Sequence, residues 1–477
     1  MLLALVFLPI LLGGIAFVLP SERHRPWLLP LGGAAHLGLT ATAIARRAPP
    51  MLSGYLVLDS LGTLVLGFTS VLFFLCFLYA PGYLKQRAER PNRVFVACLL
   101  VFVGTTSLIL LTHHLGLMWV ALEATTLCSA PLLYFNHNAR SLEAVWKYLL
   151  VGSVGIALAL LGSLFLAYSA LYARLPPSLL LDDLVRDGPA LSRPWLHAAF
   201  VLLFVGYGTK MGLAPMHTWK PDAYGEAPGL VGALLAGGLT NCAFLAILRF
   251  FRILSAAGEA AFARELMVGV GLFSIAVAGV FMARQRDYKR LLAYSSVEHM
   301  GILVLGVGVG GNAVFGSLLH LVNNGLTKGV LFLSVANIHR AFASKTVEGT
   351  TGAMRLVPVS GALFLLGFFA ITGSPPFGPF VSEFTILSAA VSGGRYVVVG
   401  LFLLLLVIVF MGMGATVLAV VQGTPAGIDK ARVRSPETFL TVAPAVVFLV
   451  LVLGLGLYLP PPLESVIRHA AAFEVTR

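Results

Sequence analysis

Uninterrupted apolar runs about as long as a lipid bilayer is thick dominate this sequence. Residues 94–122 and 299–327 each contain 29 consecutive positions without Asp, Glu, Lys or Arg, and residues 356–382 contain 27. Since a helix needs about 20 apolar residues to cross the hydrocarbon core, such runs are typical of membrane-spanning helices. Of the 477 residues 58% are hydrophobic and only 11% are charged, and the mean hydropathy is +0.93. This composition predicts an integral membrane protein and excludes an ordinary soluble domain.

Four charged residues lie deep inside segments that are otherwise apolar: Glu123, Lys210, Lys328 and Glu383. A charge at the centre of a bilayer costs roughly 3 kcal/mol on insertion scales, so such a side chain normally faces the protein interior, a partner or water. Ionisable groups of both signs at membrane depth indicate a chain that moves protons or other ions.

Prolines, glycines and charged residues divide the chain into fourteen predicted spans without a separate soluble domain. The first run, which starts at Leu2, is expected to be a retained helix because no basic leader precedes it. Basic residues are enriched in the loops at 85–93 and 284–290, which predicts that these loops are cytoplasmic and that both termini lie outside. The spans are approximately 2–19, 28–45, 58–81, 94–112, 115–135, 147–173, 196–219, 229–254, 265–283, 292–309, 313–338, 360–390, 396–422 and 440–460.

Two of these spans contain prolines that should break the helix. The seventh carries Gly212-Leu213-Ala214-Pro215, and the twelfth carries Pro375 and Pro376 within residues 373–379. Proline removes a backbone donor and clashes with the preceding turn. A break at membrane depth is tolerated only where the freed carbonyls face protein or water, so they can solvate a cation or a chain of water molecules.

The two breaks lie five spans apart, which predicts two repeats of five helices that are inverted relative to each other in the membrane. The first repeat is expected over residues 94–254 (spans 4–8) and the second over 265–422 (spans 9–13). Three helices in residues 1–93 precede the repeats, and residues 440–477 form span fourteen with a short tail. The predicted fold class is therefore an all-α integral membrane protein with broken helices seven and twelve.

The charged residues of the first repeat form a candidate proton-loading pair. Lys210 precedes Pro215 by five residues, and Glu123 lies in the middle of the fifth span, where it is the obvious counter-ion. A small change in their separation could load or release a proton. The alternative is a static ion pair that joins two helices, although ionisable residues inside membranes mark ion pathways as a rule.

The second repeat carries a polar stripe and a terminal acid. His320, Asn324 and Lys328 recur every four residues, so they share one helix face. Histidine titrates near neutral pH and a desolvated lysine can exchange a proton, so the stripe is a candidate relay between the repeats. Interhelical hydrogen bonding by Asn324 and the adjacent Asn323 is an equal alternative. Glu383, about two turns beyond the second break, is the candidate terminal site, or else a structural carboxylate tied to amides of the broken helix.

Further polar residues are candidate entrances for protons. His217 follows the first break on the predicted cytoplasmic side. The Glu298-His299 pair opens the tenth span and is expected to form either an entrance or a contact to a neighbouring subunit. Lys220, Asp222 and Glu226 could shape the same entrance, but solvated side chains are the favoured interpretation, because loops at the membrane interface need charge for solubility.

No cofactor or metal is expected in this chain. The four cysteines lie singly in apolar segments, without the CxxC spacing that holds zinc, haem or iron–sulfur clusters. Glycine spacings that could suggest a phosphate loop fall within apolar helices, where close packing explains them better. The net charge of +12 is spread over short loops, so the expected partner is the lipid bilayer and not nucleic acid.

Three strings carry a family resemblance: 210–219 (KMGLAPMHTW), 291–301 (LLAYSSVEHMG) and 378–384 (GPFVSEF). They resemble the antiporter-like membrane subunits shared by respiratory complex I, the multi-subunit cation/proton antiporters and the membrane-bound hydrogenases. The resemblance covers nearly the whole chain. The segment Tyr294–Gly301 is most similar to hydrogenase-4 component F-like subunits.

The resemblance implies roles for particular residues. Glu123 and Lys210 match the input pair that the family carries on helices five and seven. The polar stripe of span eleven matches polar family positions, and Glu383 matches the terminal ionisable residue of helix twelve. At the central position on helix eight, where the family carries lysine or histidine, this chain has Asn241, which cannot titrate but can orient water.

The resemblance therefore implies a subunit that moves protons, or sodium ions, within a respiratory or hydrogenase-type oxidoreductase complex of a prokaryotic-type cell membrane. Other membrane subunits and a peripheral module would hold the redox centres, so this chain itself would perform no electron transfer. Two alternatives stay open. One is a sodium/proton antiporter or inorganic-carbon uptake subunit without redox coupling, and the other is a structural anchor that conducts nothing.

Overall fold

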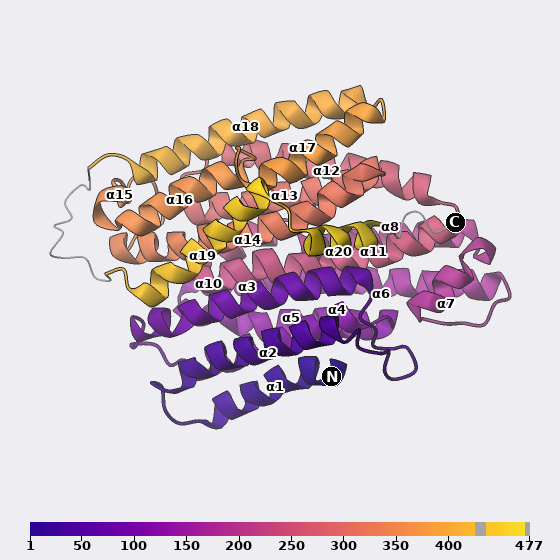
Figure 1. Cartoon of the computed structure of the whole chain (residues 1–477), viewed down its shortest axis with the longest axis horizontal. Coiled ribbons are helices and arrows are strands. Elements are labelled where there is room, and N and C mark those ends of the chain that lie inside the picture. Colours follow the sequence, from indigo (N-terminus) through magenta and orange to yellow (C-terminus); the bar gives the residue numbers. More distant parts are fainter. Residues whose placement is uncertain (425–435, 473–477) are drawn as a thin grey trace.

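The computed structural model describes residues 1–424 and 436–472, and their secondary structure is almost entirely helical. Figure 1 shows the long helices lying side by side, with α1 (Leu2–Val18) at one edge of the bundle and α18 (Tyr396–Val421) at the other. Eleven helices in the described residues are long and apolar enough to cross a membrane, and α1 and α16 (Pro358–Ile371) are shorter apolar helices. An all-α multi-pass membrane protein is thus confirmed, while the count of fourteen crossings stays a prediction.

Most of the predicted spans correspond to single continuous helices. They are α1, α2 (Leu28–Ala45), α3 (Ser60–Lys85), α4 (Arg93–Leu111), α5 (Leu115–Leu133), α6 (Ala139–Tyr172), α12 (Ala260–Met282), α13 (Tyr288–Val309), α14 (Asn312–Phe342), α18 and α19 (Phe439–Leu457). Short elements lie between them: η1 (Arg25–Trp27), η2 (Tyr134–Asn136), α7 (Leu181–Arg186), η3 (Gly188–Ala190) and α15 (Ala353–Leu356). The segment expected as a tail instead contains a helix, α20 (Pro461–Ala471), which packs against α3 and α14.

Two predicted spans are interrupted where the prolines lie. The first is divided into α8 (Arg193–Met211) and α9 (Trp219–Glu226), and the second into α16 and α17 (Gly378–Ser392). Each first half ends near a glycine with positive φ, Gly212 at 82° and Gly373 at 65°. Glycine adopts this left-handed conformation without a Cβ clash, so it lets the chain leave the helix axis.

A third interruption, in predicted span eight, was not expected. Between α10 (Gly229–Leu234) and α11 (Thr240–Ala256), residues Leu235–Leu239 form a π-helical turn labelled η4. A Cβ atom at Gly237 would lie 2.7 Å from Leu72 Cδ2 and 3.4 Å from Gly325 Cα, so the missing side chain allows close contact with α3 and α14. Such π turns are rare and occur frequently at functional sites.

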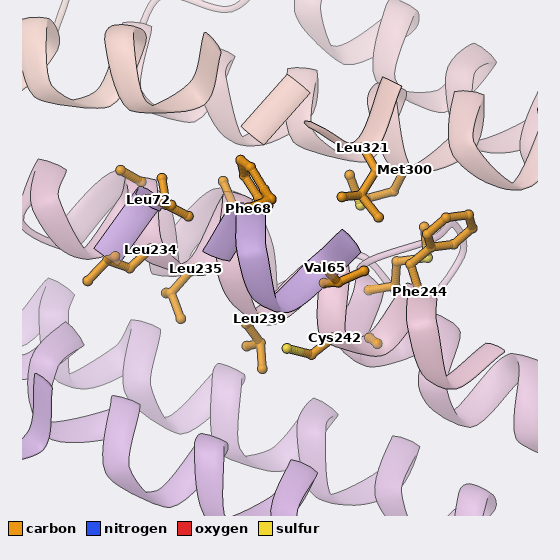
Figure 2. Close-up of a cluster of buried hydrophobic side chains, with 14 of the residues drawn as sticks. Val65, Phe68, Leu72, Leu234, Leu235, Leu239, Cys242, Phe244, Met300 and Leu321 are labelled. Carbon is orange, nitrogen blue, oxygen red and sulfur yellow. The ribbon is translucent and has the colours of Figure 1, made fainter. Parts of the chain in front are cut away.

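The hydrophobic core surrounds this π turn. Figure 2 shows apolar side chains from α3, α10, η4, α11, α13 and α14 meeting there, among them Val65, Phe68, Leu239, Met300 and Leu321. The most apolar 18-residue windows of Gly229–Ala256 and Asn312–Phe342 are wholly buried, whereas only 22% of the window in α18 is buried. Helices eight and eleven of the predicted order therefore form the centre, and α18 presents its apolar side chains outward, as lipid contact requires.

The two broken helices have similar surroundings. The first half of the first one, α8, packs along α6, and both halves of the second, α16 and α17, pack along α14. This pairing is compatible with repeats at 94–254 and 265–422, although the division into repeats stays a prediction.

Candidate functional site

The first charged pair lies where α5 meets the end of α8. Lys210 Nζ is 3.5 Å from Glu123 Oε2, and the side chains are 1% and 24% exposed, respectively. Thr126, one turn after Glu123 on α5, donates its hydroxyl to Glu123 Oε2 at 3.2 Å and accepts a hydrogen bond from the Lys210 ammonium. The structure therefore brings together the two residues that the sequence predicted as a pair, and joins them through a hydroxyl.

Helix α6 forms the wall around the Lys210 ammonium. Lys210 Nζ lies 5.6 Å from the centre of the Tyr148 ring, a distance at which cation–π attraction is favourable. A Cβ atom at Gly152 would lie 3.1 Å from Nζ, so the glycine leaves room for the ammonium. The Tyr148 hydroxyl is 2.7 Å from Ser129 Oγ of α5, which continues the polar lining.

Lys220 is one of the residues considered for a proton entrance, and its side chain was expected to be solvated. The structure contradicts this expectation, since Lys220 on the first turn of α9 is 0% exposed. Its ammonium donates to Ser296 Oγ of α13 at 3.0 Å. Lys220 and Tyr224 are four residues apart and are both buried, but this i, i+4 spacing also occurs on exposed helix faces, so it did not reveal the burial.

The other two charges of α9, unlike Lys220, make ion pairs among the described residues. Asp222 is 18% exposed and lies between Lys147 (2.8 Å) and Arg290 (2.5 Å). Glu226 is 10% exposed and pairs with Lys345 at 2.5 Å. The expectation of freely solvated side chains is therefore wrong for Glu226 as well, because the loop after α14 covers it.

Lys328 of α14 reaches the same turn of α13 that Lys220 contacts. Its ammonium is fully buried, donates to Ser295 Oγ at 2.9 Å and lies 3.3 Å from the Leu292 carbonyl oxygen. Ser295 and Ser296 are consecutive residues, so one turn of α13 supplies hydroxyl partners for two buried lysines. The amide atoms of Asn324, one turn before Lys328, have no hydrogen-bond partner among the described residues.

A chain of hydrogen bonds connects α13, α14 and the second half of broken helix twelve. His299 Nδ1 lies 2.9 Å from His320 Nε2, and His320 Nδ1 lies 2.9 Å from Ser382 Oγ. Glu298 Oε2 is 3.7 Å from His299 Nε2. Glu298 and His299 are 2% and 0% exposed, so these side chains lie inside the chain and not at a contact with a neighbouring subunit.

Glu383 completes this second cluster. Its carboxylate, His299 and His320 each offer one ligand atom, and these atoms lie within 4.8 Å of one another, which makes them the one candidate metal group among the described residues. Three of the four imidazole nitrogens are already engaged in hydrogen bonds, which leaves His299 Nε2 and the carboxylate. Protein metal sites normally supply three or more ligands, so the donor set fits a hydrogen-bonded relay better than a metal site.

The remaining predicted residues line the breaks and the π turn. Asn241 donates its side-chain amide to Gly237 O of the π turn at 2.8 Å, and Asn323 donates to Gly378 O at the second break at 2.8 Å. His217 is 7% exposed within the first break, and its Nδ1 has no hydrogen-bond partner in the described residues. Side-chain oxygens of Asn241, Asn323 and Glu383 likewise lack protein partners there. Because an unpaired buried polar atom costs free energy, these positions are suited to bind water.

Comparison with known proteins identifies the family of this chain. The sequence profile described as "NADH:quinone oxidoreductase/Mrp antiporter, TM" matches residues 112–409. The chain belongs to this family of transmembrane subunits. The matched residues include both broken helices and every ionisable residue of the two clusters.

Two curated relatives and one solved structure illustrate the similarity. The chain is 32% identical to a hydrogenase-4 component F homolog of Methylacidiphilum infernorum, over 94% of this chain and 95% of the relative. It is 27% identical to NADH-quinone oxidoreductase subunit N of Desulforudis audaxviator, over 96% and 90%. A chain of the membrane-bound sulfane sulfur reductase, an archaeal respiratory membrane complex, superposes with a TM-score of 0.89 at 19% identity, over 99% and 97% of the two chains. That likeness concerns the fold alone.

Proposed function

We propose that this chain is a proton-translocating, antiporter-like subunit of a membrane-bound redox complex. The observation that carries the proposal is two clusters of ionisable groups enclosed by helices, one between α5 and α8 and one among α13, α14 and α17. Their members are Glu123, Lys210, Lys328, Glu298, His299, His320 and Glu383. A static structural role for all of them would bury many costly charges without a return in stability.

In the proposed cycle, protons are loaded near Glu123 and Lys210 and released near Glu383. Thr126 bonds to both members of the first pair, so a small displacement of α8 against α5 would change how strongly the ammonium is held. At the other end, a proton on His320 can pass to His299 along the hydrogen bond that joins them. His217 and Asn324, whose buried polar atoms lack hydrogen-bond partners among the described residues, would orient water along the route.

Redox chemistry would reside in partner subunits, as the names of the relatives suggest for their own complexes. Moving one proton against 100 mV costs about 2.3 kcal/mol, so the partners must drive a change between two arrangements of this chain. We place the complex in a prokaryotic-type cell membrane, with both termini of this chain outside. The basic loops at 85–93 and 284–290 support this orientation.

The decisive experiment measures proton uptake by proteoliposomes that contain the purified complex, with and without its electron donor. Lys210→Met and Glu383→Gln are each expected to reduce the protons moved per electron by roughly 100-fold, as loss of a proton-transfer group does. Lys85→Gln and Glu348→Gln are matched controls, because both residues are exposed at the surface. Normal pumping by the first two variants, in fully assembled complexes, would refute the relay.

Sodium/proton exchange without redox coupling is the second candidate, because the matched family also includes Mrp antiporters. It predicts sodium-dependent proton flux in the absence of any electron donor. A structural anchor predicts no flux under either condition and no effect of the relay variants on pumping by the complex.

A further inference from the structure

Lys220 of α9 is buried against α13. Among the described residues it makes no ion pair, and its contacts are Ser296 Oγ at 3.0 Å, the Ser296 carbonyl oxygen at 3.5 Å and the Tyr224 ring at 5.9 Å. Burying an ammonium away from water costs free energy that two neutral oxygens and a ring do not fully return. Stability therefore gives no reason to keep a lysine here.

The position of Lys220 is central because its partner on α13, Ser296, is adjacent in sequence to Ser295, the partner of Lys328. Lys328 donates to Ser295 and Lys220 donates to Ser296, so the two ammonium groups approach adjacent hydroxyls on one turn of α13. Two positive charges held this way repel each other, and protonation of one disfavours protonation of the other. Such a pair favours one shared proton over two.

The two helix breaks hold charged side chains in a matching manner. A Cβ atom at Gly212 would overlap the Lys220 side chain and would lie 2.7 Å from its Nζ. A Cβ atom at Gly373 would overlap the carboxylate of Glu383. In each broken helix, therefore, a charged residue of the second half reaches back to the glycine at which the first half ends. Lys220 is the geometric counterpart of Glu383.

We propose that Lys220 is the central proton-transfer residue of this chain and passes protons to Lys328. Asn241, at the helix-eight position, has no titratable group and donates its amide to the π turn. In the proposed step the Lys220 ammonium loses a proton and becomes a neutral amine, and the neutral amine of Lys328 gains a proton and becomes an ammonium. The hydroxyls of Ser296 and Ser295, with water between them, carry the proton. The inference rests on the proposed function.

The test uses the complete complex in proteoliposomes and compares Lys220→Met with the control Lys85→Gln. Methionine keeps the length and apolar stem of lysine but carries no proton. We expect Lys220→Met to reduce the protons moved per electron by roughly 100-fold, with Lys85→Gln unchanged. If Lys220→Met pumps normally while Lys210→Met and Glu383→Gln do not, the central role of Lys220 is wrong and the proposed function survives. If all three variants pump normally, both fail.

Two more variants separate proton transfer from packing. Lys220→Arg keeps a positive charge, but its guanidinium does not release a proton in proteins, so we expect an assembled complex that does not pump. Wild-type pumping by Lys220→Arg would overturn the proposal. Adding Asn241→Lys to Lys220→Met supplies an amine from α11, beside the π turn, and we expect partial recovery of pumping. A merely structural role of Lys220 would not be rescued from another helix, so absence of any recovery in an assembled double variant counts against the proposal.

Discussion

At the scale of single residues, glycines decide where the buried charges can lie. Gly152, Gly212 and Gly373 each face a charged side chain, and a Cβ atom at any of the three would press on that side chain or overlap it. Charged groups inside a membrane protein need polar partners close by, and the absence of a Cβ lets the backbone and the charged group approach each other. These glycines are thus part of the candidate site, although they carry no chemistry.

Gly152→Ala tests this role without disturbing the helix. Alanine is favoured over glycine within a helix by roughly 1 kcal/mol, so we expect α6 to remain stable. The new methyl group would crowd Lys210 Nζ, at 3.1 Å, and we expect pumping by the complex to fall severalfold. Gly14→Ala on α1, where a Cβ would meet nothing within 4 Å, is the matched control. Equal pumping by the two variants would show that the Lys210 site tolerates the methyl group.

At the scale of elements, a buried arginine joins the end of α4 to α11. The Arg249 guanidinium donates to the carbonyl oxygens of Ile109 (3.0 Å), Leu110 (2.8 Å) and Thr112 (2.5 Å) and lies 3.5 Å from Asp59 Oδ1. The last carbonyls of a helix have no partners within the helix, so Arg249 serves as the cap of α4.

Arg249→Met should therefore be strongly destabilising. It leaves three carbonyls without the guanidinium donor and removes the cation that faces the Asp59 carboxylate, and breaking a buried pair in this way costs roughly 3 to 5 kcal/mol. Thermal unfolding of the detergent-purified chain is the measurement, with exposed Arg46→Met as the control. An unfolding temperature equal to that of the control would contradict the capping role.

A second group of hydrogen bonds between elements lies outside the spans and connects the loop after α1 to the start of α4. Burial alone would raise the pKa of Glu22, but hydrogen bonds from Arg25 (2.6 Å) and the Asn92 amide (2.8 Å) outweigh it, so the pKa lies below its usual value of 4.5. A carboxyl group with a lowered pKa stabilises the folded state above the pKa of the unfolded chain.

The expected consequence is a pH-dependent difference between wild type and Glu22→Gln. The stability advantage of wild type should be complete above about pH 5 and should disappear as the pH falls through the lowered pKa of Glu22. Unfolding temperatures of both proteins between pH 3 and pH 8 provide the measurement. If the difference in unfolding temperature is as large at pH 3 as at pH 8, the stabilisation by these hydrogen bonds does not depend on the Glu22 charge.

At the scale of the whole molecule, burial separates a polar centre from an apolar periphery. In helix α14 and in the helix interrupted by η4, every residue of the most apolar 18-residue stretch is buried. These two helices carry His320, Lys328 and Asn241. The outermost helix, α18, exposes large apolar side chains such as Val397 and Met411. A bilayer can solvate that periphery, but it cannot solvate the charges of the centre.

The proposed orientation can be tested on the intact molecule. Arg284→Cys lies in a basic loop and should react with an impermeant thiol reagent from the cytoplasmic side only, whereas Arg186→Cys on α7 should react from outside only. The native cysteines give little background, because Cys76 and Cys242 are buried and Cys98 and Cys128 are partly buried. The opposite pattern in right-side-out vesicles would reverse the orientation.

The sequence by itself was sufficient for the fold class, the broken helices and the pairing of Glu123 with Lys210. Apolar runs and prolines act locally, through burial in lipid and through the missing amide donor, so their consequences can be predicted without knowing the neighbours. The family resemblance then linked these residues to proton transfer.

Only the tertiary structure decided which charges are buried together. Lys220 follows Trp219 and precedes Pro221 and Asp222, and nothing in that order distinguishes a solvated lysine from a buried one. Its burial depends on Gly212, eight residues earlier, and on Ser296, 76 residues later. The π turn likewise arises where Gly237 meets Gly325 and Leu72. These features depend on contacts between helices distant in sequence, because packing sets the solvation of a side chain and local pattern does not.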